Sequence, residues 1–251
     1  MELELSGKRA LITGSSRGIG RAIAEVLYGE GCRIALNARG ARDCALTAES
    51  LPGAAFVQGD VSNSDDALRV VREAISKLGG LDILVCNVGS GRSVPPGFET
   101  PEEWQRVFAL NLWSTTNTVE AARAALQLSR GAIVCVSSIC GLEVVPGAPV
   151  TYSAAKAALH AYIRGIARPL GMSGIRINAV APGNIIFEGS VWSSRLASDG
   201  AGVQNMLERD VALNRLGEPR EVAELVAYLV SPRAGFATGG VWALDGGQVH
   251  V

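Results

Sequence analysis

Two side chains suited to proton transfer, Tyr152 and Lys156, stand four residues apart in the sequence. At that spacing in a helix they share one face and lie within side-chain reach. A phenol titrates near pH 10, and a neighbouring ammonium group favours its ionised form, which suits it to acid–base work nearer neutrality. Tyr–Lys pairs at this spacing also occur on helix surfaces, so the meaning of the pair depends on the elements that carry it.

A serine precedes this pair at the end of an apolar run. Residues Ala132–Ser137 predict a buried strand, and Ser138 follows it directly. The carboxyl ends of the strands of a parallel sheet form its ligand crevice. A hydroxyl at that place can hydrogen-bond a substrate oxygen, and either Ser138 or its neighbour Ser137 has the right position.

A glycine-rich turn follows the first predicted strand, Arg9–Thr13. Glycines permit a tight turn and close approach of a pyrophosphate, and the helix that follows presents free N–H groups to it. Glycines also serve ordinary strand–helix turns, whereas a P-loop would need Lys-Ser or Lys-Thr after them. We expect the turn to bind a dinucleotide through Gly14, Ser15, Ser16, Arg17, Gly18, Ile19 and Gly20.

The end of the second predicted strand bears on which dinucleotide binds. NAD-binding sheets carry an acidic residue there that grips the ribose 2′-hydroxyl. This chain has Ala38 followed by Arg39 at that place, and Arg17 adds a second cation from the turn. Because arginine pairs with phosphate, the pattern favours NADP(H) over NAD(H). Asp60, after the third strand, is placed to accept from the adenine amine, or to cap a helix.

Short apolar runs alternate with helical patterns along the whole chain, which predicts an α/β fold. We expect a doubly wound parallel (Rossmann) sheet of seven strands with helices on both faces, in one domain spanning 1–251. The predicted strands are Arg9–Thr13, Arg33–Leu36, Ala54–Val57, Leu81–Cys86, Ala132–Ser137, Arg176–Ala181 and Val241–Leu244. The predicted helices are 19–30, 41–50, 62–78 (N-capped by Ser62 or Asn63), 101–128, 150–172 and 219–230.

The segment 189–215 lacks clean strand–helix alternation, which predicts an irregular substrate lid over about 187–215. Its apolar members Phe187, Trp192, Met206 and Leu207 are candidates to cover a substrate, and ordinary packing is the alternative.

Composition excludes several other classes of protein. The 251 residues carry a net charge of −1 without basic clusters, so no nucleic-acid partner is expected. Five scattered cysteines and two histidines predict neither a disulfide framework nor a metal site. We expect His160 on a helix surface or at an interface. No apolar run is long enough to span a membrane and the N-terminus does not resemble a signal peptide, so a cytoplasmic location is expected.

Together these motifs resemble the short-chain dehydrogenase/reductase family, in its compact branch, and within it the 3-oxoacyl-acyl-carrier-protein reductases. The resemblance spans the chain. The residues that carry it are Thr13–Gly20, Asp60-Val61, Asn87-Val88-Gly89, Asn111, Ser138, Tyr152, Lys156 and Pro182-Gly183.

The resemblance implies a role for each of these residues. Tyr152 would exchange the proton, Lys156 would also hold the nicotinamide ribose, and the Ser138-x-x-Gly141 run selects Ser138 over Ser137 to orient the carbonyl. Asn111 would anchor a water in a proton relay with Lys156. Further cofactor contacts would come from Asp60, Val61, Asn87, Val88, Gly89, Pro182, Gly183 and Ile185.

The implied activity is hydride transfer between NADP(H) and a small carbonyl or secondary-alcohol substrate. A 3-oxoacyl thioester, a sugar or another ketone would fit, and an extended-branch epimerase or a non-catalytic cofactor-binding regulator are the competing classes. The family also implies a homotetramer, or a homodimer, built through helices 101–128 and 150–172. Val88 and Phe187 depart from the family's usual alanine and threonine, and the Ser138–Tyr152 spacing is one residue longer.

Overall fold

The computed structural model describes residues 2–40, 47 and 49–250. Seven parallel strands form one sheet in the order β3-β2-β1-β4-β5-β6-β7, which confirms the predicted doubly wound architecture. The strands are β1 Arg9–Thr13, β2 Arg33–Ala38, β3 Ala55–Gln58, β4 Ile83–Cys86, β5 Ala132–Val136, β6 Arg176–Pro182 and β7 Val241–Leu244. The strand order reverses between β1 and β4, and ligands bind in such sheets beside that reversal.

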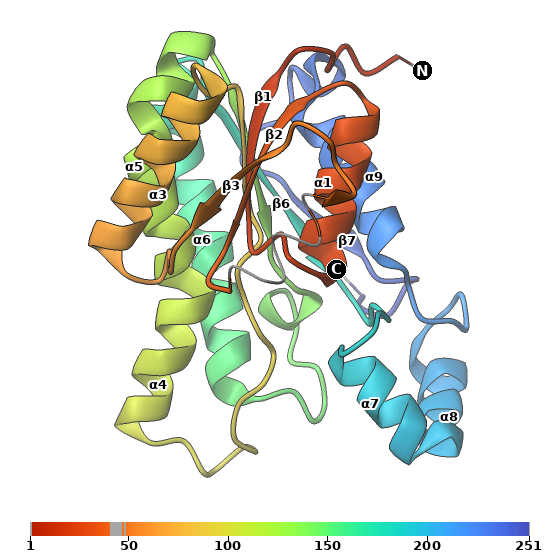
Figure 1. The fold of residues 1–251 in the computed structure, drawn as a ribbon. Helices are drawn as coiled ribbons and strands as arrows, with labels where there is room; N and C mark the ends of the chain where they lie inside the picture. The colour runs from red at the N-terminus through yellow and green to blue at the C-terminus, as the bar shows by residue number, and fades with distance from the viewer. Residues whose placement is uncertain (1, 41–46, 48, 251) are drawn as a thin grey trace.

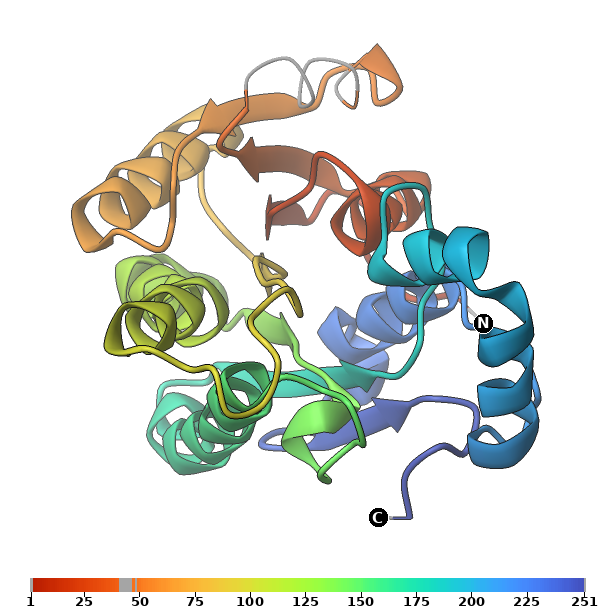
Figure 2. The same cartoon turned by 90° about the horizontal axis from the view of Figure 1, so that it is seen from below.

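Helices cover both faces of this sheet, as Figures 1 and 2 show. Helices α1 (Gly18–Gly29) and α9 (Pro219–Val230) pack together over one face. Helices α3 (Ser64–Leu78), α5 (Ser114–Ser129) and α6 (Val150–Met172) cover the other. The central strands β4 and β5 are buried along their whole length, because helices close over both of their faces.

Local signals set several helix ends. The Asn63 side chain accepts hydrogen bonds from the backbone N–H groups of Asp65 and Asp66, so Asn63 rather than Ser62 caps α3. Gly79 ends the same helix at a φ of 76°, which a glycine adopts without strain. The predicted helix 41–50 lies largely outside the described residues.

The predicted long helix 101–128 is wrong in one respect. It consists of α4 (Pro101–Phe108), a π-helical turn (Ala109–Trp113) and α5. The side-chain amide of Asn111 donates to the carbonyl oxygen of Val107 over 3.0 Å, in competition with the regular backbone bonds. A π turn inside a helix often marks a functional position, and here it contains the polar residue that the sequence had singled out.

The expectation of an irregular segment at 187–215 is also wrong. Helices α7 (Val191–Ser198) and α8 (Gly200–Asp210) form most of it, and they project from the lower right of the sheet in Figure 1. Ser190 and Asp199 cap the two helices through their side chains. A small separate core of Val203, Leu207 and Val211 holds the pair together, because Trp192 of α7 packs against it. The apolar positions were too few for the helical period to stand out.

Candidate active site

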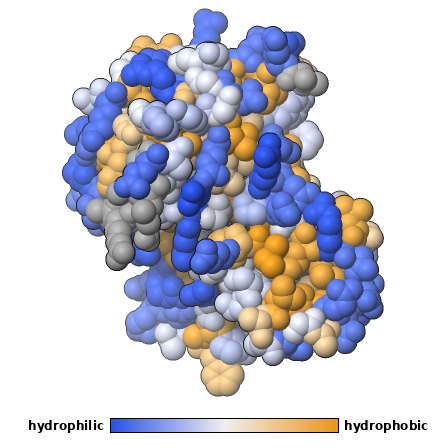
Figure 3. All heavy atoms as spheres, turned by 45° about the vertical axis from the view of Figure 1, so that its right-hand side comes forward, coloured by the Kyte–Doolittle hydropathy of each residue, from blue (hydrophilic) through white to orange (hydrophobic). Residues whose placement is uncertain are grey.

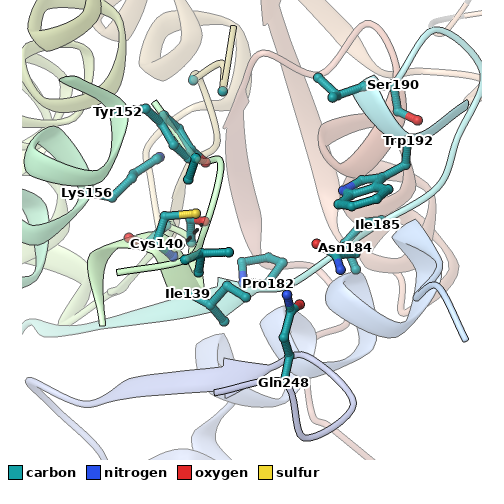
Figure 4. A pocket seen from close by; sticks show the side chains of 18 of the residues that line it. Ile139, Cys140, Tyr152, Lys156, Pro182, Asn184, Ile185, Ser190, Trp192 and Gln248 are labelled. Atoms are coloured by element: carbon teal, nitrogen blue, oxygen red, sulfur yellow. Dashed lines mark hydrogen bonds between the residues drawn. The ribbon is translucent and has the colours of Figure 1, made fainter. Parts of the chain in front are cut away.

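A cleft of about 910 Å³ opens at the carboxyl ends of the strands, beside the reversal of strand order. Figure 4 shows side chains from α6, the β6 end, the α7 segment and the C-terminal tail facing one another across it. Among the residues predicted from sequence, those lining it are Gly14, Arg17, Ile19, Gly20, Asn87, Gly89, Ser138, Tyr152, Lys156, Pro182, Gly183 and Ile185. The remaining ones, Ser15, Ser16, Gly18, Arg39, Asp60, Val61, Val88 and Asn111, do not line the cleft.

The glycine-rich turn is braced against the end of β4. The Asn87 side-chain amide donates to the carbonyl oxygens of Gly14, over 2.9 Å, and of Thr13, over 3.2 Å. A β-carbon at position 20 would collide with the Gly14 carbonyl and with the Asn87 amide. The turn therefore keeps a compact shape that only glycine at position 20 allows, with the N-terminus of α1 beneath it. Such a cradle suits an anionic group.

The two arginines predicted to select NADP(H) lie differently. Arg17 lines the cleft at the start of α1. Arg39 lies outside it at the β2 end, with 72% of its side chain exposed and its Nη1 3.6 Å from Asp60 Oδ2. Asp60 also accepts from the backbone N–H and hydroxyl of Ser62. An exposed guanidinium at this strand end is free to turn toward a phosphate, so the residues present fit a 2′-phosphorylated dinucleotide.

Tyr152 and Lys156 lie one turn apart on α6 and both face the cleft (Figure 4). The Lys156 ammonium lies 5.8 Å from the centre of the Tyr152 ring and donates to the carbonyl oxygen of Val136 over 3.1 Å. The bond to Val136 holds the lysine in place at the end of β5. Burial lowers the pKa of Lys156 to about 8, because the charged form loses hydration.

The pKa of Tyr152 differs from the sequence-based expectation. Burial raises it above the usual range, and the hydroxyl of Ser138 acts in the opposite direction; Lys156 is not among the causes. The effect of desolvation on the pKa of the half-buried phenol is larger than that of the hydrogen bond with Ser138. Tyr152 is therefore a neutral phenol at pH 7, the form that can donate a proton.

Asn111 is buried behind the cleft in the π turn. Its Oδ1 accepts from the backbone N–H of Ser90 over 3.0 Å, and its Nδ2 donates to the Ser90 carbonyl over 3.2 Å. A β-carbon at position 89 would stand 2.8 Å from Asn111 Oδ1 and 3.2 Å from Lys156 Nζ. The asparagine thus fixes the loop after β4 at a point where this loop closely approaches Lys156.

The two adjacent serines after β5 have separate partners. Ser138 accepts from the backbone N–H of Cys140 and lies beside Tyr152. Ser137 lies 2.6 Å from the Nε2 of His160, which is buried in α6. The expectation that His160 lies on a helix surface or at an interface is wrong. His160 follows Lys156 by four residues, as Lys156 follows Tyr152. This repeated spacing was the sequence signal that His160 is a third member of the same helix face.

Other cleft residues escaped the sequence analysis. Cys140, the loop 143–149 and the tail residues Gln248, Val249 and His250 all line the cleft. The tail is held by Asp245, which accepts from the backbone N–H groups of Gly247 and Val249. No local motif marks such a tail as part of a site, because its place depends on where β7 ends.

The α7–α8 segment supplies the outer wall of the cleft. Phe187, Trp192 and Met206 line it. Leu207 does not line the cleft and packs in the small core beside α7, which agrees with the alternative of ordinary packing. The Arg195 guanidinium lies 4.9 Å over the Trp192 ring. Figure 3 shows apolar side chains exposed on the lobe at lower right, where these helices lie. This wall combines apolar surface with cationic groups.

The described residues contain no group of three or more His, Cys, Asp or Glu side chains arranged to hold a metal ion. None of the described helices is long and apolar enough to cross a membrane.

Comparison with known proteins places this architecture among reductases. The sequence model of the enoyl-(acyl carrier protein) reductase family matches residues 14–249. The chain is 39% identical over 243 residues to the granaticin polyketide synthase putative ketoacyl reductase 2 of Streptomyces violaceoruber, covering 95% of this chain and 94% of that protein. It is 33% identical over 248 residues to the 3-oxoacyl-[acyl-carrier-protein] reductase FabG of Staphylococcus epidermidis, covering 96% and 98%.

Solved structures agree with the sequence relatives. The L-sorbose reductase of Gluconobacter frateurii, complexed with NADPH and L-sorbose, superposes with a TM-score of 0.92 at 30% identity and full coverage of both chains. A dehydrogenase/reductase from Sinorhizobium meliloti superposes with a TM-score of 0.90 at 33% identity, covering 99% of this chain and 98% of that one.

Proposed function

Because the chain belongs to the short-chain dehydrogenase/reductase family, we propose that it transfers a hydride between NADP(H) and a carbonyl or secondary-alcohol substrate. The observation that carries the proposal is the meeting of Ser138, Tyr152 and Lys156 in one cleft with the glycine-rich turn. The nicotinamide of NADPH, when bound, supplies the hydride.

In the direction of reduction, Tyr152 donates its phenolic proton to the substrate oxygen as the carbon–oxygen double bond becomes an alcohol. The Ser138 hydroxyl hydrogen-bonds the same oxygen and stabilises the charge that develops on it. The Lys156 ammonium, anchored at Val136, stabilises the phenolate left on Tyr152. Asn111 holds the loop at Ser90 beside Lys156. It would also anchor a water through which a proton returns to the Tyr152 phenolate.

The cofactor would be held along the glycine-rich turn and across the β1–β4 reversal. Residues 14–20 would bind the pyrophosphate, Arg17 and Arg39 the 2′-phosphate, and Asp60 and Val61 the adenine. Asn87, Val88 and Gly89 would hold the sugars, and Pro182, Gly183 and Ile185 the nicotinamide. The braced turn and the exposed Arg39 support this assignment.

The substrate lies between the loop 143–149 and the lid segment 187–215, whose helices α7 and α8 form the outer wall of the cleft. A 3-oxoacyl thioester is the alternative substrate to a small ketone, because the ketoacyl reductases are relatives over nearly the whole chain. A sugar ketone is favoured instead by the likeness to the L-sorbose reductase.

The chain acts as one domain over 1–251, in a homotetramer, or a homodimer, that contacts its copies through α4, α5 and α6. Small residues on α6, among them Ala154, Ala157 and Ala158, suit close helix packing. A cytoplasmic location accompanies this proposal.

A side-by-side titration of the purified protein with NADPH and NADH at one fixed salt concentration tests the cofactor. Tighter NADPH binding is expected; equal or tighter NADH binding would reject the 2′-phosphate site but keep hydride transfer. A panel of 3-oxoacyl thioesters, ketose sugars and small ketones then identifies the substrate.

The variant Tyr152→Phe separates an enzyme from a cofactor-binding regulator. It should lower kcat at least a hundredfold, while the dissociation constant for NADPH stays the same. If Tyr152→Phe keeps its turnover, Tyr152 is not the acid. If the wild-type protein binds neither NADPH nor NADH, the proposal that it is an enzyme is rejected.

A further inference from the structure

The helix face that carries Tyr152 and Lys156 continues for one more turn to His160. Each of the three meets a consecutive residue at the end of β5. Lys156 binds the carbonyl of Val136, His160 meets the hydroxyl of Ser137, and Tyr152 lies beside Ser138. His160 touches no open part of the cleft, and neither it nor Ser137 has a role in the proposed reaction.

The hydrogen bonds of His160 define which nitrogen of the neutral ring carries the proton. Its Nδ1 lies 3.0 Å from the carbonyl oxygen of Gly141, which can only accept, so Nδ1 carries a proton. In the neutral ring Nε2 then accepts, and the Ser137 hydroxyl donates to it over 2.6 Å. One imidazole therefore joins the end of β5 to the far end of the 3₁₀ turn Ile139–Gly141.

The surroundings favour the neutral ring. Burial lowers the pKa of His160 to about 4, and the charges of Lys156 and Arg164 act in the same direction; the bond to Gly141 opposes them. Tyr152 and Cys140 are the other titratable groups near this end of α6, and burial raises the pKa of both.

The segment held by this imidazole is the one that carries Ser138. Ser137 is also fixed through its backbone, which donates to Val180 over 2.7 Å. At the other end Gly141 packs so closely on α6 that a β-carbon would stand 2.6 Å from the carbonyl carbon of Lys156. The three residues between these points, Ser138, Ile139 and Cys140, all line the cleft.

We propose that His160 and Ser137 form a neutral clamp that positions the Ser138 hydroxyl relative to Tyr152. His160 is a positioning residue, since it touches the loop and not the reacting atoms. The inference rests on the proposed function, because its effect is exerted on the step that uses Ser138 and Tyr152.

Kinetics of clamp variants test the role. Ser137→Ala removes the donor, and His160→Asn keeps an amide donor for Gly141 but loses the acceptor for Ser137. Each should lower kcat roughly 10- to 100-fold, since a small misplacement of a reacting group costs about this much, with the dissociation constant for NADPH unchanged. The double variant should be no slower than the worse single one, because both changes break the same bond.

Two further variants separate positioning from general weakening of the fold. His160→Gln places an amide oxygen near the site of Nε2, so it should recover part of kcat relative to His160→Asn. Ser231→Ala removes another buried hydroxyl, one that donates to Tyr228 away from the cleft, and should leave kcat unchanged. Equal losses of kcat in Ser231→Ala and Ser137→Ala, or additive losses in the double variant, would overturn the clamp.

Nitrogen-15 NMR of the imidazole rings tests the geometry without turnover. The chain has only two histidines, so His160→Asn assigns both signals. The expected result is a neutral Nδ1–H tautomer for His160 that persists at pH 5, and a charged ring or an Nε2–H tautomer would overturn the clamp.

The two proposals fail in distinguishable ways. If the wild type reduces a carbonyl and both Ser137→Ala and His160→Asn match it, the clamp is rejected and the proposed function stands. If the wild type turns over no carbonyl substrate, the proposed function fails and the positioning role fails with it, whatever tautomer the NMR spectrum shows.

Discussion

The ring of Phe187 lies against the α-carbon of Gly18. A β-carbon at position 18 would stand 2.5 Å from the ring edge, and Gly18 also has a φ of 54°, in the region that glycine favours. The first residues of the lid segment therefore touch the cofactor turn directly. The bulky Phe187, where the family usually has threonine, is compatible with this turn because position 18 has no side chain.

This contact predicts the behaviour of two variants. Gly18→Ala should weaken NADPH binding about tenfold or more, because the new methyl group must displace Phe187 and the alanine must adopt a backbone conformation that strains it. In a Phe187→Ala background the same change should cost less, since only the backbone strain remains. Isothermal titration of the four proteins checks this, and a cost that is the same in both backgrounds would contradict the contact.

Arg39 should determine cofactor preference. Arg39→Ala should weaken NADPH binding about 10- to 100-fold and leave NADH binding unchanged, because a hydrogen-bonded charge pair contributes about 1.5 to 3 kcal/mol. Arg33→Ala, an exposed change at the other end of β2, is the matched control. A parallel loss of both dinucleotides would instead assign Arg39 a structural role.

Ser138→Ala should reduce kcat about 100- to 1000-fold, as the loss of one donor to a developing oxyanion does, with little effect on thermal stability. Steady-state kinetics and thermal melts of the same preparation measure both. A change confined to KM would mean that Ser138 only binds the substrate.

Lys156 should make stability depend on pH in the alkaline range. Its pKa falls from 10.5 to about 8 on folding, so between these values the unfolded chain binds more protons. The free energy of unfolding contributed by this group therefore rises with pH across that window and is lost as pH falls through about 8.

Comparison with Lys156→Met measures this contribution. The stability of the wild type relative to the variant should increase by about 1 to 3 kcal/mol between pH 7.5 and 10, as followed by urea unfolding. Parallel curves for the two proteins would contradict the buried position of the ammonium group.

Patterns within short stretches of sequence were sufficient to predict the parts of this protein that neighbouring residues encode. The alternation of apolar runs and helical periods defined the seven-strand sheet, because parallel strands buried on both faces need continuous apolar residues. The Tyr152–Lys156 spacing and the glycine turn were equally legible, since one helical turn and one strand–helix junction each fit within a few residues.

The packing of the fold sets the features that depend on contacts between distant segments. It buried His160 against Ser137, gave Asn111 the loop at Ser90 as its partner, and brought the C-terminal tail to the cleft wall. It also made burial rather than Lys156 the dominant influence on the pKa of Tyr152. These outcomes depend on desolvation and on partners up to about a hundred residues away in the sequence. The backbone N–H of His250, for example, donates to the carboxylate of Glu143. Neither effect can be predicted from the spacing of nearby residues.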